Sequence, residues 1–156
     1  MNDKVSLREV RERDLETFFS DQLDPESVRL AAFRSRDREA FMALWLQIIT
    51  DTSVAARAIL LEGELAGHVV SWEQDGERKI GYWLGKAYWG QGVASAALSQ
   101  FLVQCAARPL VAHVAKHNAP SLRVLQKCGF TISGEARTRM ADGEYVEDYL
   151  LRLDSQ

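Results

Sequence analysis

The alternation of strand-like and helix-like segments after residue 55 constrains the fold of this chain most strongly. Period-two hydrophobic patterns and turn residues predict three strands, at 55–61, 65–72 and 79–84. From Gly90 the period becomes helical, with apolar residues four apart at 93, 97, 101 and 105. A strand, a short helix and two strands follow, at 110–115, 119–128, 130–139 and 145–153. Helices that connect strands in this way predict a mixed α/β sheet flanked by helices.

The first fifty residues add one strand and three helical segments. Alternation of side chains predicts the strand over 5–10, and an apolar face predicts a helix over 14–23. Asp24 before Pro25 is typical of the N-cap and first turn of a second helix. An i, i+3, i+4 apolar stripe predicts an amphipathic helix over 37–50.

Composition excludes several classes of protein. The 156 residues, 47% of them apolar, fit one domain spanning 1–156 that folds without a disulfide scaffold. Cys105 and Cys128 form no CxxC pair, and the three histidines have no ligand spacing, so we expect no metal. The apolar runs are shorter than a membrane span, and residues 1–4 lead into no signal-peptide core. These features predict a cytoplasmic protein that does not contact a membrane.

Charge is distributed unevenly along the chain, whose net charge is −3. Residues 1–78 carry ten basic and sixteen acidic side chains, whereas 79–139 carry eight basic ones and a single acid, Glu135. Residues 140–156 carry one basic and five acidic side chains. A basic middle within an acidic protein favours a local anion site over a nucleic-acid surface.

Two segments carry the chemistry. In the first, Gly90 and Gly92 separate a strand from a helix, where backbone N–H groups and the helix dipole suit a phosphate. The loop lacks the lysine of a triphosphate-binding P-loop. In the second segment, Asn118 stands between a strand and a helix, where its amide can cap the helix or hold a ligand, and capping is the commoner role.

Together the segments resemble the GNAT superfamily of N-acetyltransferases, most closely the branch that resembles ribosomal-protein alanine N-acetyltransferases. The similarity lies in IGYWLGKAYWGQGVASAAL (80–98), NAPSLRVLQKCGF (118–130) and GEARTRMADGEYVEDYLLRL (134–153). It implies a splayed, mostly antiparallel sheet of six to seven strands. It also implies acetyl-CoA as a cosubstrate between the strands at 79–85 and 110–115, and no metal.

The resemblance also implies which residues bind acetyl-CoA. The pantetheine arm pairs with the backbone of one strand, and the pyrophosphate lies on the glycine loop. Trp89 stands where the superfamily usually has Gln or Arg, which removes a side-chain donor. The implied set is Tyr82, Trp83, Leu84, Trp89, Gly90, Gln91, Gly92, Val93, Ala94, Ser95, Asn118, Ser121 and Lys127.

Three residues are candidates for proton chemistry. In related N-terminal acetyltransferases, a tyrosine seven residues after the motif asparagine acts as the general acid, but here that residue is Leu125. Ser121 therefore becomes the candidate hydrogen-bond donor to the leaving thiolate. In some relatives a glutamate five residues before that asparagine acts as the general base. This chain has His113 at that position, which makes His113 a candidate base. Glu73 is the rival base, and a histidine that only lines the cleft is the alternative.

The function predicted from this resemblance is acetyl transfer to a primary amine by direct attack in a ternary complex. The acceptor is a protein N-terminus, a polyamine or another small amine, and the motifs do not choose among them. A non-catalytic acyl-CoA-binding module is the alternative, and transfer to oxygen is a third hypothesis. A homodimer is left open, and no nucleic-acid partner is expected.

Overall fold

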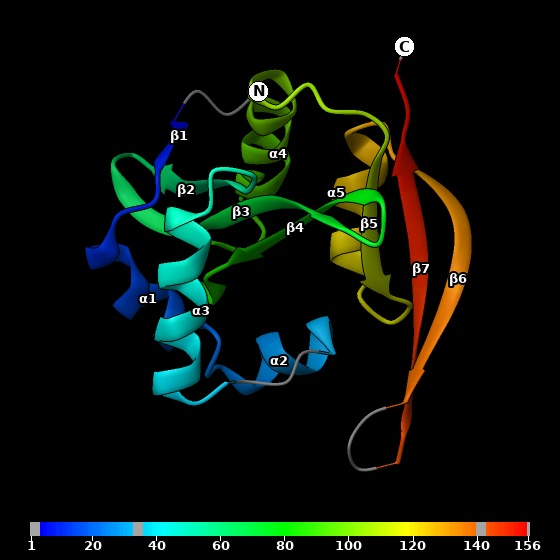
Figure 1. Cartoon of the computed structure of the whole chain (residues 1–156), viewed down its shortest axis with the longest axis horizontal. Helices are drawn as coiled ribbons and strands as arrows, with labels where there is room; N and C mark the ends of the chain where they lie inside the picture. The colour runs from blue at the N-terminus through cyan, green and yellow to red at the C-terminus, as the bar shows by residue number, and fades with distance from the viewer. Residues whose placement is uncertain (1–3, 33–35, 140–142, 156) are drawn as a thin grey trace.

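Seven strands form one sheet, in the order β1-β2-β3-β4-β5-β7-β6 (Figure 1). The computed structural model describes residues 4–32, 36–139 and 143–155. The strands are β1 (Val5–Glu9), β2 (Ala55–Leu61), β3 (Glu64–Gln74), β4 (Glu77–Leu84), β5 (Leu110–Ala115), β6 (Thr131–Arg139) and β7 (Tyr145–Leu153). Neighbouring strands are antiparallel except β4 and β5, which are parallel. The predicted mixed, mostly antiparallel sheet is confirmed.

Helices lie on both sides of this sheet. They are α1 (Leu15–Asp21), α2 (Pro25–Ala31), α3 (Arg38–Thr50), α4 (Val93–Gln104) and α5 (Ala119–Lys127), with 3₁₀ turns η1 (Glu12–Asp14) and η2 (Lys86–Tyr88). Asp24 and Asp37 cap α2 and α3 by accepting backbone N–H bonds from Ser27 and Ala40. Among the described residues, none of the helices combines the length and the apolar character needed to cross a bilayer.

Several predicted boundaries differ from those observed by one to three residues, including the starts of two helices. The helix expected from residue 14 begins at Leu15, after the 3₁₀ turn η1. The helix expected from Gly90 begins only at Val93, because Gly90 and Gly92 both have φ near +74°, which lies outside the α-helical region. The glycine loop therefore stays a loop, with the first turn of α4 directly after it.

Two-residue turns set the register of the strands before the loop. Glu62 and Gly63 have φ of 51° and 83°, and Asp75 and Gly76 have φ of 54° and 77°. Positive φ at both central residues matches the right-handed twist of an antiparallel hairpin. Part of the turn expected at Asp142-Gly143 lies outside the described residues.

The two faces of the sheet bury different cores. On one face Leu98 and Phe101 of α4 pack with Leu84, Leu125 and their neighbours. On the other face α1 and α3 enclose an aromatic cluster in which Phe18 and Trp45 each lie 4.6 Å from the ring of His68. Burial lowers the pKa of His68 to about 3, so this histidine is a neutral core residue.

Strands β4 and β5 pair over only a short stretch. The ladder joins Arg78 to Leu110 and Lys79 to Val111. Beyond that point β5 continues to pair with β7, while β4 continues to pair with β3. The sheet is therefore splayed, as expected, and the opening lies along Gly81–Leu84.

Gly67 of β3 fixes the position of β4 beside this opening. A Cβ atom on Gly67 would overlap the carbonyl oxygen of Trp83 and lie 3.0 Å from the Cα atom of Leu84. Both neighbours are backbone atoms, so β4 itself would have to move to make room.

Gly67→Ala should lower the free energy of unfolding by about 1–3 kcal/mol, because overpacking against backbone atoms is relieved only by shifting a strand. Gly134→Ala is the matched control, since a Cβ atom there meets Leu150 Cδ1 at 3.6 Å, an ordinary contact. Urea denaturation of both variants measures the difference. Equal changes in the two variants would show that β3 and β4 separate at no cost.

Candidate active site

The open edge of β4 presents backbone groups without a strand partner. The Gly85 N–H donates to Ala66 O (2.8 Å), so the odd-numbered residues of β4 bond to β3. Tyr82 and Leu84 therefore point their N–H and C=O groups toward the β5 side. Within the described strands, β5 has already separated from β4 at this point.

A cavity of about 340 Å³ lies along this edge. It is lined by residues of α2, β4, the glycine loop and the first turns of α4 and α5: Ser27, Leu30, Ala31, Tyr82, Trp83, Leu84, Trp89, Gly90, Ala94, Asn118, Pro120, Ser121, Arg123 and Val124. A second cavity of about 110 Å³ lies between β4 and β5. Ala31, Tyr82, Asn118 and Ser121 line both cavities, so these four residues mark the place where the two meet.

The glycine loop lies at one end of the larger cavity. Cβ positions on Gly90 and Gly92 would have nothing within 4 Å, so the loop surface is open. The N–H groups of the first turn of α4 have no acceptor within the helix, and that turn contains no acidic residue. Trp89, Gly90 and Ala94 line the cavity, whereas the Val93 side chain is buried in the core and contributes only its backbone. This arrangement can receive an anion.

Trp89 connects the loop to the strand. Its indole N–H donates to the carbonyl of Leu84 (3.0 Å). The indole donor that replaces the superfamily's usual Gln or Arg therefore points to β4, and the Gln91 amide donates to Ala87 O (3.1 Å) within the loop. Neither the Trp89 indole nor the Gln91 amide is therefore directed at an anion in the cavity, and the loop offers its backbone N–H groups.

A pair of hydroxyl groups lies where the two cavities meet. The Tyr82 hydroxyl donates to Ser121 Oγ (3.0 Å), which leaves the Ser121 proton available to another acceptor. Burial raises the pKa of Tyr82, so its hydroxyl stays protonated. Asn118 caps α5 by accepting the Ser121 N–H (3.3 Å). Sequence reasoning assigned Tyr82 only a backbone role, although the alternation of β4 places its side chain with Ile80 and Leu84 on the α4 side.

His113 lies on the opposite face of the opening and lines the smaller cavity. Its Nε2 atom is 3.1 Å from Lys79 Nζ, and since an ammonium group can only donate, Nε2 accepts. Lys79 also forms an ion pair with Glu77 (3.1 Å). Burial and the Lys79 charge lower the pKa of His113, against the opposing effect of Asp148 and Glu77. The neutral imidazole is therefore favoured.

The structure does not bring Glu73 or Lys127 to the cavities. Glu73 is exposed on β3 opposite Arg78, next to the turn that joins β3 to β4. Lys127 is exposed at the last residue of α5, one turn beyond Arg123, which does line the larger cavity. Sequence reasoning missed Arg123, although it lies within one helical turn of Ser121 and Val124. The roles predicted for Glu73 and Lys127 stay predictions, and no contact of either residue with the cavities supports them.

Similar proteins share this architecture. Residues 4–131 match the family described as acetyltransferase (GNAT) domain. The "Uncharacterized N-acetyltransferase p20" of Bacillus licheniformis is 24% identical over 97% of this chain and 93% of its own. A GNAT-family acetyltransferase of Bacillus anthracis has a TM-score of 0.81 at 18% identity, covering 99% of this chain and 96% of that one.

A spermidine N-acetyltransferase of Vibrio cholerae, solved with CoA and spermine, has a TM-score of 0.85 at 16% identity, covering 98% and 96% of the two chains. At these identities the solved structures establish a common fold. The family match covers well over half of the chain and does not depend on the solved structures. The chain therefore belongs to the acetyltransferase (GNAT) domain family.

Proposed function

We propose that this protein transfers the acetyl group of acetyl-CoA to a primary amine by direct attack in a ternary complex. One observation carries the proposal: the open edge of β4 joins an anion-receptive loop at Gly90–Ser95 to the Tyr82–Ser121 hydroxyl pair. Acetyl-CoA carries its pyrophosphate, its amide-containing pantetheine arm and its thioester in this same order. The resemblance of three segments to ribosomal-protein alanine N-acetyltransferases supports a protein N-terminus as one acceptor, and this finer assignment stays a prediction.

Groups of the protein are available to bind each part of acetyl-CoA, the proposed donor. Backbone N–H groups of the loop and the first turn of α4 would hold the pyrophosphate, with the Arg123 guanidinium on the same cavity. The outward N–H and C=O groups of Tyr82 and the N–H of Leu84 would pair with the pantetheine amides as an added strand. The Leu84 carbonyl already accepts from Trp89.

Ser121 would act on the sulfur. As the amine nitrogen bonds to the carbonyl carbon and the C–S bond breaks, negative charge develops on the sulfur, and the Ser121 O–H would donate to it. Tyr82 would act as a positioning residue, because its own donated bond to Ser121 Oγ leaves the serine proton directed elsewhere.

His113 would take up the proton that the amine loses. Its neutral form is favoured, which is the form that accepts a proton. Nε2 would have to exchange its bond from Lys79 for one from the amine or a water molecule.

The alternative, an acyl-CoA-binding module without catalysis, predicts binding without turnover. Release of free CoA in the presence of a panel of primary amines tests the proposed function directly. CoA release with no amine above the hydrolysis background, from protein that binds acetyl-CoA, would favour the module.

Gly92→Asp should weaken acetyl-CoA binding at least tenfold, or about 1.4 kcal/mol, because the carboxylate would repel the pyrophosphate. Asp is tolerated at positive φ and is a good N-cap, so the fold should persist. Isothermal titration calorimetry measures the affinity. Gly63→Asp is the control, with φ of +83° and equally open surroundings in the β2–β3 turn. Equal affinities for the two variants would make the loop purely structural.

Ser121→Ala should lower kcat about tenfold to a hundredfold and leave the acetyl-CoA Kd within about twofold, because the hydrogen bond strengthens only as charge develops on sulfur. Tyr82→Phe should lower kcat in the wild-type background and have no further effect in Ser121→Ala, because Tyr82 acts through that serine. Steady-state kinetics of the four proteins gives this cycle. An unchanged kcat with a raised KM would assign Ser121 to binding.

The acidic limb of the pH–rate profile should lie below the ordinary histidine pKa of about 6.5, because burial and Lys79 lower the pKa of His113. kcat/KM should rise with pH through that value, since the neutral imidazole is active. His113→Gln should flatten the limb and reduce the rate about tenfold or more. Lys79→Met should move the limb to higher pH by removing a positive charge. Profiles are compared with one acceptor, and an unchanged limb in both variants would exclude His113.

A further inference from the structure

Asp148 is a half-buried carboxylate on the face of the sheet that carries His113. In the β5–β7 ladder it lies opposite Ala115, which lines the smaller cavity, and diagonally from His113. Diagonal neighbours in such a ladder are about 7–8 Å apart, within reach of one small molecule. Ser121 and Tyr82 approach the opening from the α4 and α5 side. Asp148 therefore lies on the side from which an acceptor would reach His113.

Among the residues that the structure describes, Asp148 has no close partner for its charge. Within the described residues, no hydrogen bond or ion pair ends on this carboxylate, whereas the more deeply buried Asp14 is held by Arg8 at 2.7 Å. Burial raises the pKa of Asp148, and His113 and His117 act against that shift. An unpaired carboxylate in such a place is costly to keep ionised, which is typical of a site that awaits a cation.

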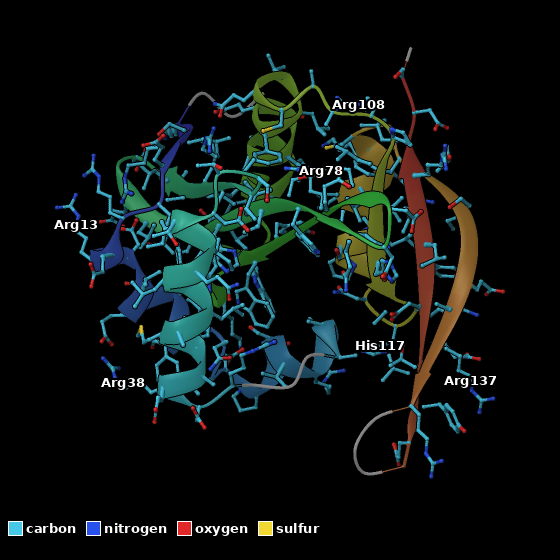
Figure 2. All side chains as sticks on the ribbon, viewed as in Figure 1. Arg13, Arg38, Arg78, Arg108, His117 and Arg137 are labelled. Atoms are coloured by element: carbon cyan, nitrogen blue, oxygen red, sulfur yellow. The ribbon has the colours of Figure 1, made fainter. Side chains whose placement is uncertain are left out.

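The neighbouring charged groups are already engaged. The cation of Lys79 is paired with Glu77 and bonded to His113. The His117 ring donates to the carbonyl of Arg29 at the end of α2 (2.7 Å), and Figure 2 shows His117 projecting from the turn after β5 near β7. Lys116 forms ion pairs with Glu135 and Glu147. None of these three side chains forms a hydrogen bond or ion pair with Asp148.

We propose that Asp148 binds a second positive charge on the acceptor, so that the preferred substrate is an amine that also carries an ammonium group. The inference rests on the proposed function and names the class of its acceptor. The reacting nitrogen must be neutral to attack, so it belongs beside His113, while a second, protonated nitrogen lies against the Asp148 carboxylate. A monoamine leaves that carboxylate unpaired and gains no such interaction.

Putrescine and butylamine test this inference as a matched pair, because both have four carbons and only the diamine carries a second nitrogen. The wild-type protein should show a kcat/KM for putrescine about tenfold or more above that for butylamine. At a pH above the acidic limb, where His113 is neutral in both proteins, Asp148→Asn should remove this preference by lowering the value for putrescine, with butylamine unchanged within about twofold and acetyl-CoA affinity unchanged.

Asp21→Asn is the matched control variant. Asp21 is also half-buried, and within the described residues it too has no hydrogen bond or ion pair; burial raises its pKa to about 6. Its carboxylate lies beside Gly85, six residues along β4 from Lys79 and so about 20 Å from the His113 end. This variant should keep the preference for putrescine.

Two results would overturn the inference: a wild-type protein that does not distinguish the two amines, or an Asp148→Asn variant that loses activity equally with both. If neither amine releases CoA, the panel of primary amines decides the proposed function, and calorimetry with putrescine and acetyl-CoA-loaded protein decides the cation site separately. Binding of putrescine that Asp148→Asn abolishes and Asp21→Asn preserves would support the site. Binding that is absent or unaffected by Asp148→Asn would exclude it.

Discussion

The separation of β4 from β5 after two residue pairs is the constraint on which the site depends. β5 is bonded along its whole length to β7, and β4 to β3, so each strand belongs to its own part of the sheet. Each part twists as a unit, and the two parts diverge once their shared ladder ends. The opening exposes backbone groups at Tyr82 and Leu84 and lets side chains from both faces meet. Without it, the glycine loop would be an ordinary connection into a helix.

The two faces of the opening contribute different chemistry. The α4 and α5 side presents backbone N–H groups, Arg123 and two hydroxyl groups, which suit an anionic thioester and its leaving sulfur. The opposite side presents a neutral imidazole and the carboxylate of Asp148, which suit an amine that must lose one proton. Lys79 lies where β4 and β5 separate and favours the neutral form of His113 by its charge. A single pair of strands would therefore separate the proposed donor from the proposed acceptor while keeping their reactive ends close.

Local patterns predicted most of the fold, because helices, strands and turns follow from short-range residue spacing. The stripe at 37–50, the capping Asp24 and the glycine loop all lie where the pattern placed them, and residues 80–98 and 118–130 indicated the family. Such local patterns could not predict the side-chain contacts across the opening between β4 and β5. The bonds from Tyr82 to Ser121 and from Lys79 to His113 join positions 39 and 34 residues apart, and their lengths depend on how far the sheet splays. Glu73 was predicted as an alternative base from its position at the end of a hairpin. The register of that hairpin pairs it with Arg78, away from the cavities.

The groups that the site needs are also groups whose burial costs stability. Outward backbone groups of β4 and the Asp148 carboxylate gain little from the protein itself. The fold tolerates them because each part of the sheet is anchored elsewhere, by the α4 core on one face and the aromatic cluster around His68 on the other. Ligands that satisfy these groups bind only the folded state, so each should raise the free energy of unfolding with the logarithm of the ratio of its free concentration to its Kd. Because the proposed donor and acceptor would contact opposite faces, their stabilising effects can be measured separately by supplying one at a time.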